Sequence, residues 1–117
     1  MDAEEYKKKI EKDVLEIIEK KLKEGEIKAE RAKEIAGYVY DALHPRLSID
    51  QIYKIAQNFD DHFPELKKVV VDASYDYEDR LREVVTKQVD KLISQNKIEE
   101  ADTLLEKALN KEINVEE

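Results

Sequence analysis

The sequence contains no cysteine, no tryptophan, two glycines and two prolines in 117 residues. Without cysteine the chain forms no disulfide and offers no thiolate as a nucleophile or metal ligand. Two isolated glycines cannot build the glycine-rich loop that cradles a phosphate group. No serine lies in a G-x-S-x-G motif, which positions a nucleophile in many hydrolases. We therefore expect a protein that is not an enzyme and that needs no cofactor.

Long apolar runs are also missing. No segment approaches the roughly 18 apolar residues that a membrane span requires. The first residues, MDAEEYKKKIEKD, are charged from the second position and lack the apolar core of a signal peptide. The absence of cysteine fits a reducing compartment. We expect a cytoplasmic protein that does not contact membranes.

Charged side chains are abundant and mixed in sign. The chain has 21 lysines and arginines and 29 aspartates and glutamates, which gives a net charge of −8. No basic stretch is long enough to neutralise a run of phosphates, so we expect no direct nucleic-acid binding. A continuous acidic face that imitates nucleic acid is disfavoured by the mixing of charges. An acidic inhibitor of a nucleic-acid-binding protein stays as a weaker alternative.

Apolar residues recur every three or four positions along the whole chain, which is the spacing of amphipathic helices. No segment alternates as a strand would. The sequence therefore predicts an all-α fold, a compact bundle of five helices in one domain that covers residues 1–117. The predicted helices span residues 3–24, 28–43, 49–61, 64–94 and 98–112, and residues 112–117 are predicted to form a frayed tail.

Local signals mark several of the helix ends. Asp2 with Glu5 and Ser48 with Gln51 have the spacing of capping boxes, in which two side chains satisfy free backbone N–H groups. Pro64 suits the first position of a helix, where its missing N–H costs nothing.

The fourth predicted helix is about 30 residues long, which corresponds to roughly 45 Å. Its apolar residues follow two offset lines, a pattern typical of a central helix with neighbours on two sides. We expect the first two helices to form a hairpin, and the last helix to fold back on the C-terminal half of the long one. Either several shorter helices cover the long helix or a second copy does, so a homodimer through this helix is one alternative.

The segment KLISQNKIEEADTLLEKA has a helix end, a short polar turn and a second helix that begins with acidic residues and alanine. It resembles a helical hairpin of the tetratricopeptide type over about 25 residues. The large aromatic and glycine positions of that family are absent, and its period of about 34 residues is not sustained. We therefore predict no repeat array.

The stretch NFDDHFPEL, residues 58–66, concentrates side chains that can bind metal or transfer protons. Asp61, His62 and Glu65 form a possible metal half-site, and a metal-binding protein or metal-dependent enzyme is the alternative functional hypothesis. His44, the other histidine, precedes the third predicted helix, so about 20 Å of helix separates the two imidazoles. The favoured interpretation is a helix corner, in which an aspartate or His62 caps the helix that begins at Pro64.

Residues 72–83, DASYDYEDRLRE, form the most acidic helical segment. Asp76 with Arg80 and Glu78 with Arg82 are four residues apart, so they are predicted to form ion pairs along one exposed helix face.

Two tyrosines lie away from the main apolar lines of their helices. Tyr38 and Tyr75, with Val71 one turn before Tyr75, are the candidates for an exposed contact surface, because tyrosine is a common interface anchor. Either tyrosine can instead cover a second side of the core. The leading functional hypothesis is a non-catalytic protein-interaction or regulatory module that binds a protein partner or associates with itself.

Overall fold

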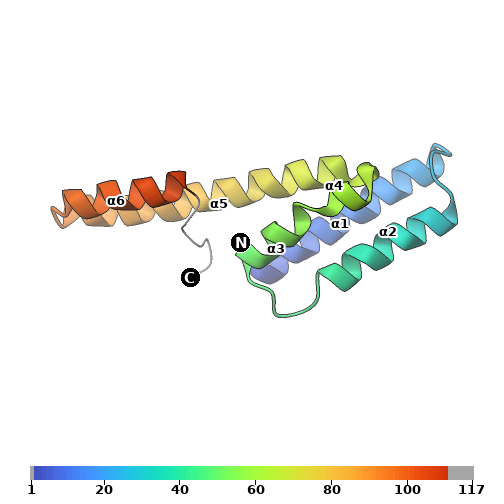
Figure 1. The fold of residues 1–117 in the computed structure, drawn as a ribbon, viewed down its shortest axis with the longest axis horizontal. Helices are drawn as coiled ribbons and strands as arrows, with labels where there is room; N and C mark the ends of the chain where they lie inside the picture. Colours follow the sequence, from blue (N-terminus) through green and yellow to red (C-terminus); the bar gives the residue numbers. More distant parts are fainter. Residues whose placement is uncertain (1, 111–117) are drawn as a thin grey trace.

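The computed structural model describes residues 2–110, and within them every regular element is a helix (Figure 1). The predicted fold class, an all-α bundle of five helices around one long helix, is confirmed. The elements are α1 (Ala3–Lys23), α2 (Ala29–Ala42), α3 (Ile49–Ala56), α4 (Phe59–His62), the 3-10 helix η1 (Pro64–Leu66), α5 (Lys67–Ser94) and α6 (Ile98–Leu109). The predicted tail at residues 112–117 lies outside the described residues.

The third predicted helix is interrupted, which corrects the expectation of one helix over residues 49–61. α3 ends at Ala56, and the one-turn α4 begins at Phe59. Between them the Asn58 N–H donates to the Ile55 carbonyl at 3.2 Å, a tighter turn than the α-helix. The break re-aims the chain, so that Phe59 is fully buried at the start of α4.

The N-terminal caps predicted at Asp2 and Ser48 form. The Asp2 carboxylate accepts from the Glu5 N–H at 2.8 Å. Ser48 and Gln51 make the complete reciprocal capping box at the start of α3. Pro64 begins η1, and the helical path then continues through α5 to Ser94.

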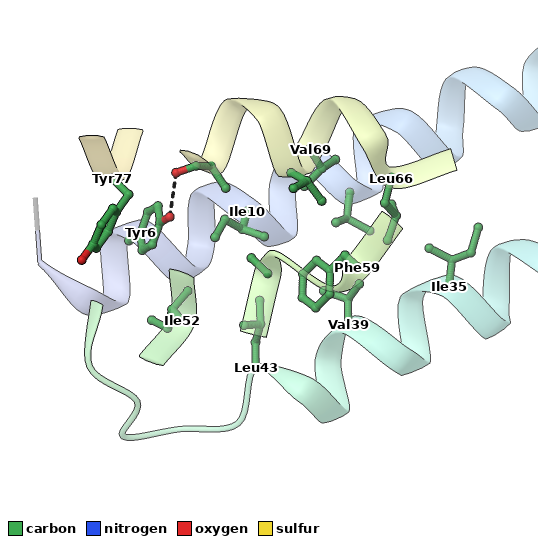
Figure 2. Close-up of a cluster of buried hydrophobic side chains, with 14 of the residues drawn as sticks. Tyr6, Ile10, Ile35, Val39, Leu43, Ile52, Phe59, Leu66, Val69 and Tyr77 are labelled. Carbon is green, nitrogen blue, oxygen red and sulfur yellow. Dashed lines mark hydrogen bonds between the residues drawn. The ribbon is translucent and has the colours of Figure 1, made fainter. Parts of the chain in front are cut away.

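One apolar core joins α1, α2, α3, α4, η1 and the first half of α5 (Figure 2). Its largest fully buried side chains come from five of these elements: Tyr6, Ile10, Ile35, Ile52, Phe59 and Leu66. The Tyr6 hydroxyl donates to the Ala73 carbonyl at 2.7 Å, which satisfies a polar group at the α1–α5 interface. Burial raises the pKa of the Tyr6 hydroxyl, so it stays a neutral donor.

The long helix extends beyond this core. The main core ends at Tyr77, with Leu81 packed against its edge, and α6 folds back along the remaining part of α5 (Figure 1). The molecule measures 59 × 24 × 19 Å, with a radius of gyration of 17.5 Å. A near-spherical chain of this length has a radius of gyration of about 13 Å. The structure is therefore a helical body from which the α5–α6 hairpin extends.

None of the helices within residues 2–110 combines the length and the apolar character needed to cross a membrane.

Replacing Phe59 with alanine is expected to lower the free energy of unfolding by about 3–5 kcal/mol, because it opens a cavity where α2, α4 and the start of α5 meet. Leu22→Ala, at a partly exposed position on α1, is the control and should change stability by less than about 1 kcal/mol. Urea denaturation followed by circular dichroism measures both. Equal losses for the two variants would show that Phe59 is not a core residue.

Candidate functional site

The stretch at residues 58–66 forms a closed corner between α3 and α5. Phe59 is fully buried, and the half-buried Phe63 lies beside it on the next turn. Tyr38 of α2 covers both rings edge-on, with centroid distances of 5.7 Å to Phe59 and 5.3 Å to Phe63. The corner is therefore held by aromatic packing, for which such geometries are favourable.

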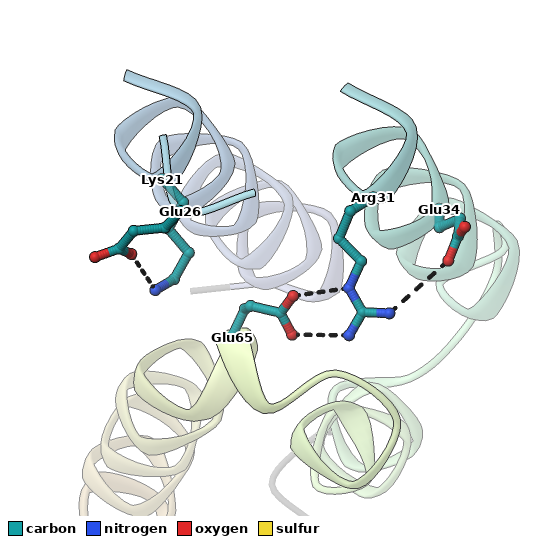
Figure 3. A network of polar contacts seen from close by, with 5 residues as sticks. All are labelled: Lys21, Glu26, Arg31, Glu34 and Glu65. Atoms are coloured by element: carbon teal, nitrogen blue, oxygen red, sulfur yellow. Dashed lines mark hydrogen bonds and ion pairs between the residues drawn. The ribbon is translucent and has the colours of Figure 1, made fainter. Parts of the chain in front are cut away.

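An ion pair closes the corner from the side of α2 (Figure 3). The Arg31 guanidinium donates from Nε to Glu65 Oε2 at 2.8 Å and from Nη2 to Oε1 at 3.1 Å. Its central carbon lies 4.7 Å from the centre of the Phe63 ring. Arg31 hydrogen bonding lowers the pKa of the Glu65 carboxyl. This bidentate pair joins α2 to η1 across residues that are far apart in sequence.

The three residues of the predicted metal half-site have different surroundings. Both oxygens of Glu65 accept from Arg31. His62 is exposed and its ring lies 4.8 Å from that of Tyr38, while Asp61 is exposed. Among residues 2–110, no three histidine, aspartate or glutamate side chains are grouped so as to hold a metal ion. Glu65 acts here as a structural partner of Arg31.

The predicted side-chain cap before Pro64 is wrong. Phe63 occupies the cap position of η1, and no side chain hydrogen-bonds to the free N–H groups there. The first turn of α5 also lacks such a bond. The carboxylates of Asp60 and Asp61 therefore do not fix this corner by capping, and the packing of Phe59 and Phe63 does so instead.

The predicted ion pairs on α5 are also wrong. Asp76 pairs with Lys9 of α1. Arg80 pairs with Glu83 at 3.4 Å, and Arg82 pairs with Asp79 at 3.0 Å. Because α1 packs along this side of α5, Lys9 of α1 pairs with Asp76, the residue that was predicted to pair with Arg80.

A buried polar contact that the sequence analysis missed joins α3 to α5. The Tyr77 hydroxyl donates to Asp50 Oδ1 at 2.6 Å, and Asp50 is only 8% exposed. The Tyr53 ring stacks on the Tyr77 ring, with centroids 3.9 Å apart and planes 7° apart. Burial and the bond to Asp50 raise the pKa of the Tyr77 hydroxyl. Asp50 lies in the first turn of a helix, where acidic residues are usually exposed, so its position gave no signal of burial.

The three candidate contact residues separate into two groups. Tyr38 is half-buried in the aromatic corner, which is the core-covering role left open for it. Val71 and Tyr75 remain exposed on the outer side of α5, at 44% and 63%. We refer to Val71 and Tyr75 as the α5 face.

A second exposed apolar surface lies on the α5–α6 hairpin. Ile93, Ile98, Leu105 and Leu109 are between 49% and 83% exposed, and we call them the hairpin face. Helical spacing of about 100° per residue places Ile98, Leu105 and Leu109 on one side of α6. None of these four residues lines the open groove of about 770 Å³ between α5 and α6, whose lining includes Leu92 and Leu104, three lysines (Lys91, Lys97 and Lys107) and two glutamates (Glu99 and Glu100). Ile98, Leu105 and Leu109 belong to the apolar pattern of α6, and α5 alone does not cover them.

Comparisons with protein-family models, with curated proteins and with solved structures give no match to this chain. The tetratricopeptide resemblance therefore stays a likeness of one short segment.

Replacing Tyr77 with phenylalanine is expected to reduce the free energy of unfolding by about 1–3 kcal/mol, because it removes a buried hydrogen bond to Asp50 and keeps the ring. Tyr53→Phe also keeps the stacked pair and is the matched control, with little expected change. Urea denaturation compares the two. Equal effects would mean that the Tyr77–Asp50 bond contributes nothing specific.

The Arg31–Glu65 pair predicts a pH dependence of stability. Because the folded-state pKa of Glu65 is lowered, the pair stabilises the fold at neutral pH, and this contribution is lost as the pH falls through the folded-state pKa. The stability difference between wild type and Glu65→Gln should therefore be largest near neutral pH and shrink in acid. Denaturation curves across that range test this, with Glu30→Gln on α2 as the control. A difference that is constant with pH would contradict the assignment.

Proposed function

We propose that this protein is a non-catalytic interaction module that binds another protein through exposed apolar surface on its long helix and terminal hairpin. The observation that carries the proposal is the placement of six large apolar side chains. They are exposed on two surfaces: the α5 face, on the part of α5 that packs in the body, and the hairpin face, on the hairpin that extends from it.

Exposed apolar residues that occur singly are normal on a protein surface, whereas grouped ones are typical of interaction sites. The α5 face adds a tyrosine, a residue type enriched at binding hot spots. A second copy of the chain is one possible occupant of the α5 face, which corresponds to the homodimer expected from the length of the helix. The mixed charges elsewhere, with pairs such as Arg82–Asp79, favour a solvated surface around these two faces.

Affinity capture from the cells that produce the protein tests this proposal. Wild type should retain a defined partner, or should form a dimer in solution as measured by light scattering. Combined Val71→Ala and Tyr75→Ala substitutions should reduce that retention or dimerisation several-fold if the α5 face takes part, while helicity is unchanged.

Tyr40→Ala is the matched control, since Tyr40 is an exposed tyrosine on α2. Retention no greater than that of an unrelated acidic helical protein, together with a monomeric mass at every concentration, would contradict an interaction role.

A further inference from the structure

We infer that the hairpin face binds an amphipathic helix whose apolar side is flanked by lysine or arginine. This inference rests on the proposed interaction function and specifies one surface and one class of partner for it. It depends on three features of the α5–α6 hairpin: its apolar stripe, the charges along the edges of that stripe, and its separation from the main core.

The apolar stripe has the spacing that receives a helix. Ile98, Leu105 and Leu109 lie along one flank of α6, with the exposed Asp102 between Ile98 and Leu105, and Ile93 is exposed near the end of α5. α6 has 12 residues, so the stripe is roughly 18 Å long, or a little over three helical turns. A partner helix that presents apolar residues at every third or fourth position can follow it over this length.

The charged side chains that border the hairpin face on α6 are acidic. Asp102 and Glu106 are exposed and border the hairpin face on α6, and neither forms an ion pair with another described residue. The groove of the hairpin is lined by charges of both signs: Lys91, Lys97 and Lys107 together with Glu99 and Glu100. Arg82, near the body end of the face, is already paired with Asp79 at 3.0 Å. The apolar stripe therefore has an uncompensated acidic edge.

The acidic side chains beside the stripe favour a binding partner with positive charges. Lysine or arginine beside the apolar side of a partner helix would face Asp102 and Glu106 and gain electrostatic attraction. A second copy packed antiparallel on α6, with the two-fold axis across the helices, would bring the acidic edges of both chains together. Residues 111–117 carry one lysine and three glutamates, so attraction to this edge is weak for that segment also. Charge complementarity thus favours a basic partner helix.

The hairpin also has its own small core, which keeps the face in place. Val84 and Val85 of α5 and Ala101 of α6 are buried outside the main cluster. The four residues of the hairpin face are not needed for that burial, because they remain largely exposed. Substitutions in the face should therefore change binding without unfolding the hairpin.

Two synthetic peptides of about 14 residues test the inference. Both carry the same leucine stripe at helical spacing, and one has lysine at the flanking positions while the other has glutamate. The wild-type protein should bind the lysine peptide at least about tenfold more tightly than the glutamate peptide, since several exposed charge contacts change sign between them. Fluorescence anisotropy with labelled peptides measures both dissociation constants.

Charge reversal on the protein provides the decisive comparison. A variant with Asp102→Lys and Glu106→Lys should reverse the preference and bind the glutamate peptide more tightly. A variant with Glu30→Lys and Asp41→Lys on α2 has the same net charge and should retain the wild-type preference. Ile98→Ser combined with Leu105→Ser should abolish binding of both peptides, with helicity preserved.

Several results would overturn the inference. Unchanged peptide binding by the Ile98→Ser and Leu105→Ser variant would place binding elsewhere. Equal responses of the two charge-reversed variants would reduce the effect to net charge. A wild-type dimer that Leu105→Ser converts to monomer would assign the face to a second copy. Cellular partner capture that is lost with the α5-face variant but unaffected by the hairpin variants would overturn this inference and leave the proposed function standing.

Discussion

The length of α5 is the constraint on which the rest of the structure depends. With η1 it forms a nearly continuous helical path of roughly 45 Å, and its apolar side chains follow that whole length. The body formed by α1 to α4 covers the part as far as Leu81. Beyond that point the chain reverses and lays α6 along α5, in the region where Val84 and Val85 are buried. An amphipathic helix that is longer than the helices packed on its first half needs other helices to cover its second half. Here a single helix, α6, does so. One helix leaves one flank of the hairpin uncovered, which explains where the exposed isoleucines and leucines come from.

The corner at residues 58–66 illustrates how local chemistry and tertiary packing compete. Asp61, His62 and Glu65 offer donors and acceptors, yet the two phenylalanines determine how the chain turns. Phe59 enters the core, Phe63 meets Tyr38, and the Arg31 guanidinium lies over the Phe63 ring while it binds both oxygens of Glu65. A carboxylate held in this way has a lowered pKa and a fixed direction, both of which serve the α2–η1 contact. The polar residues of this stretch therefore lie at a turn of the chain whose two aromatic rings pack inward.

The positions of the helices could be predicted from the sequence, whereas most side-chain contacts between helices could not. Apolar spacing and caps such as Ser48 with Gln51 depend on residues close in sequence, so the fold class and most helix bounds could be predicted. The break after Ala56 could not, because no glycine or proline marks it and the burial of Phe59 decides it. Asp76 pairs with Lys9 on α1, and Asp50 with Tyr77 on α5, across distances in sequence that helical spacing does not address. Of the candidate contact residues, Val71 and Tyr75 are exposed and their role in contact stays a prediction, whereas Tyr38 lies in the aromatic corner.

The hairpin and the body have separate cores but share one helix, and this combination matters for binding. A hairpin attached by a flexible loop would lose orientational freedom whenever its face bound a partner, and that loss would weaken binding. Here α5 runs without interruption from the body into the hairpin, so its backbone hydrogen bonds fix the direction of the hairpin before any partner arrives. The small core around Val84, Val85 and Ala101 then holds α6 in register on that rigid support. The apolar face and the acidic side chains Asp102 and Glu106 beside it are thereby held at a set distance from the body. A partner helix can bind to this pre-organised surface without ordering it first.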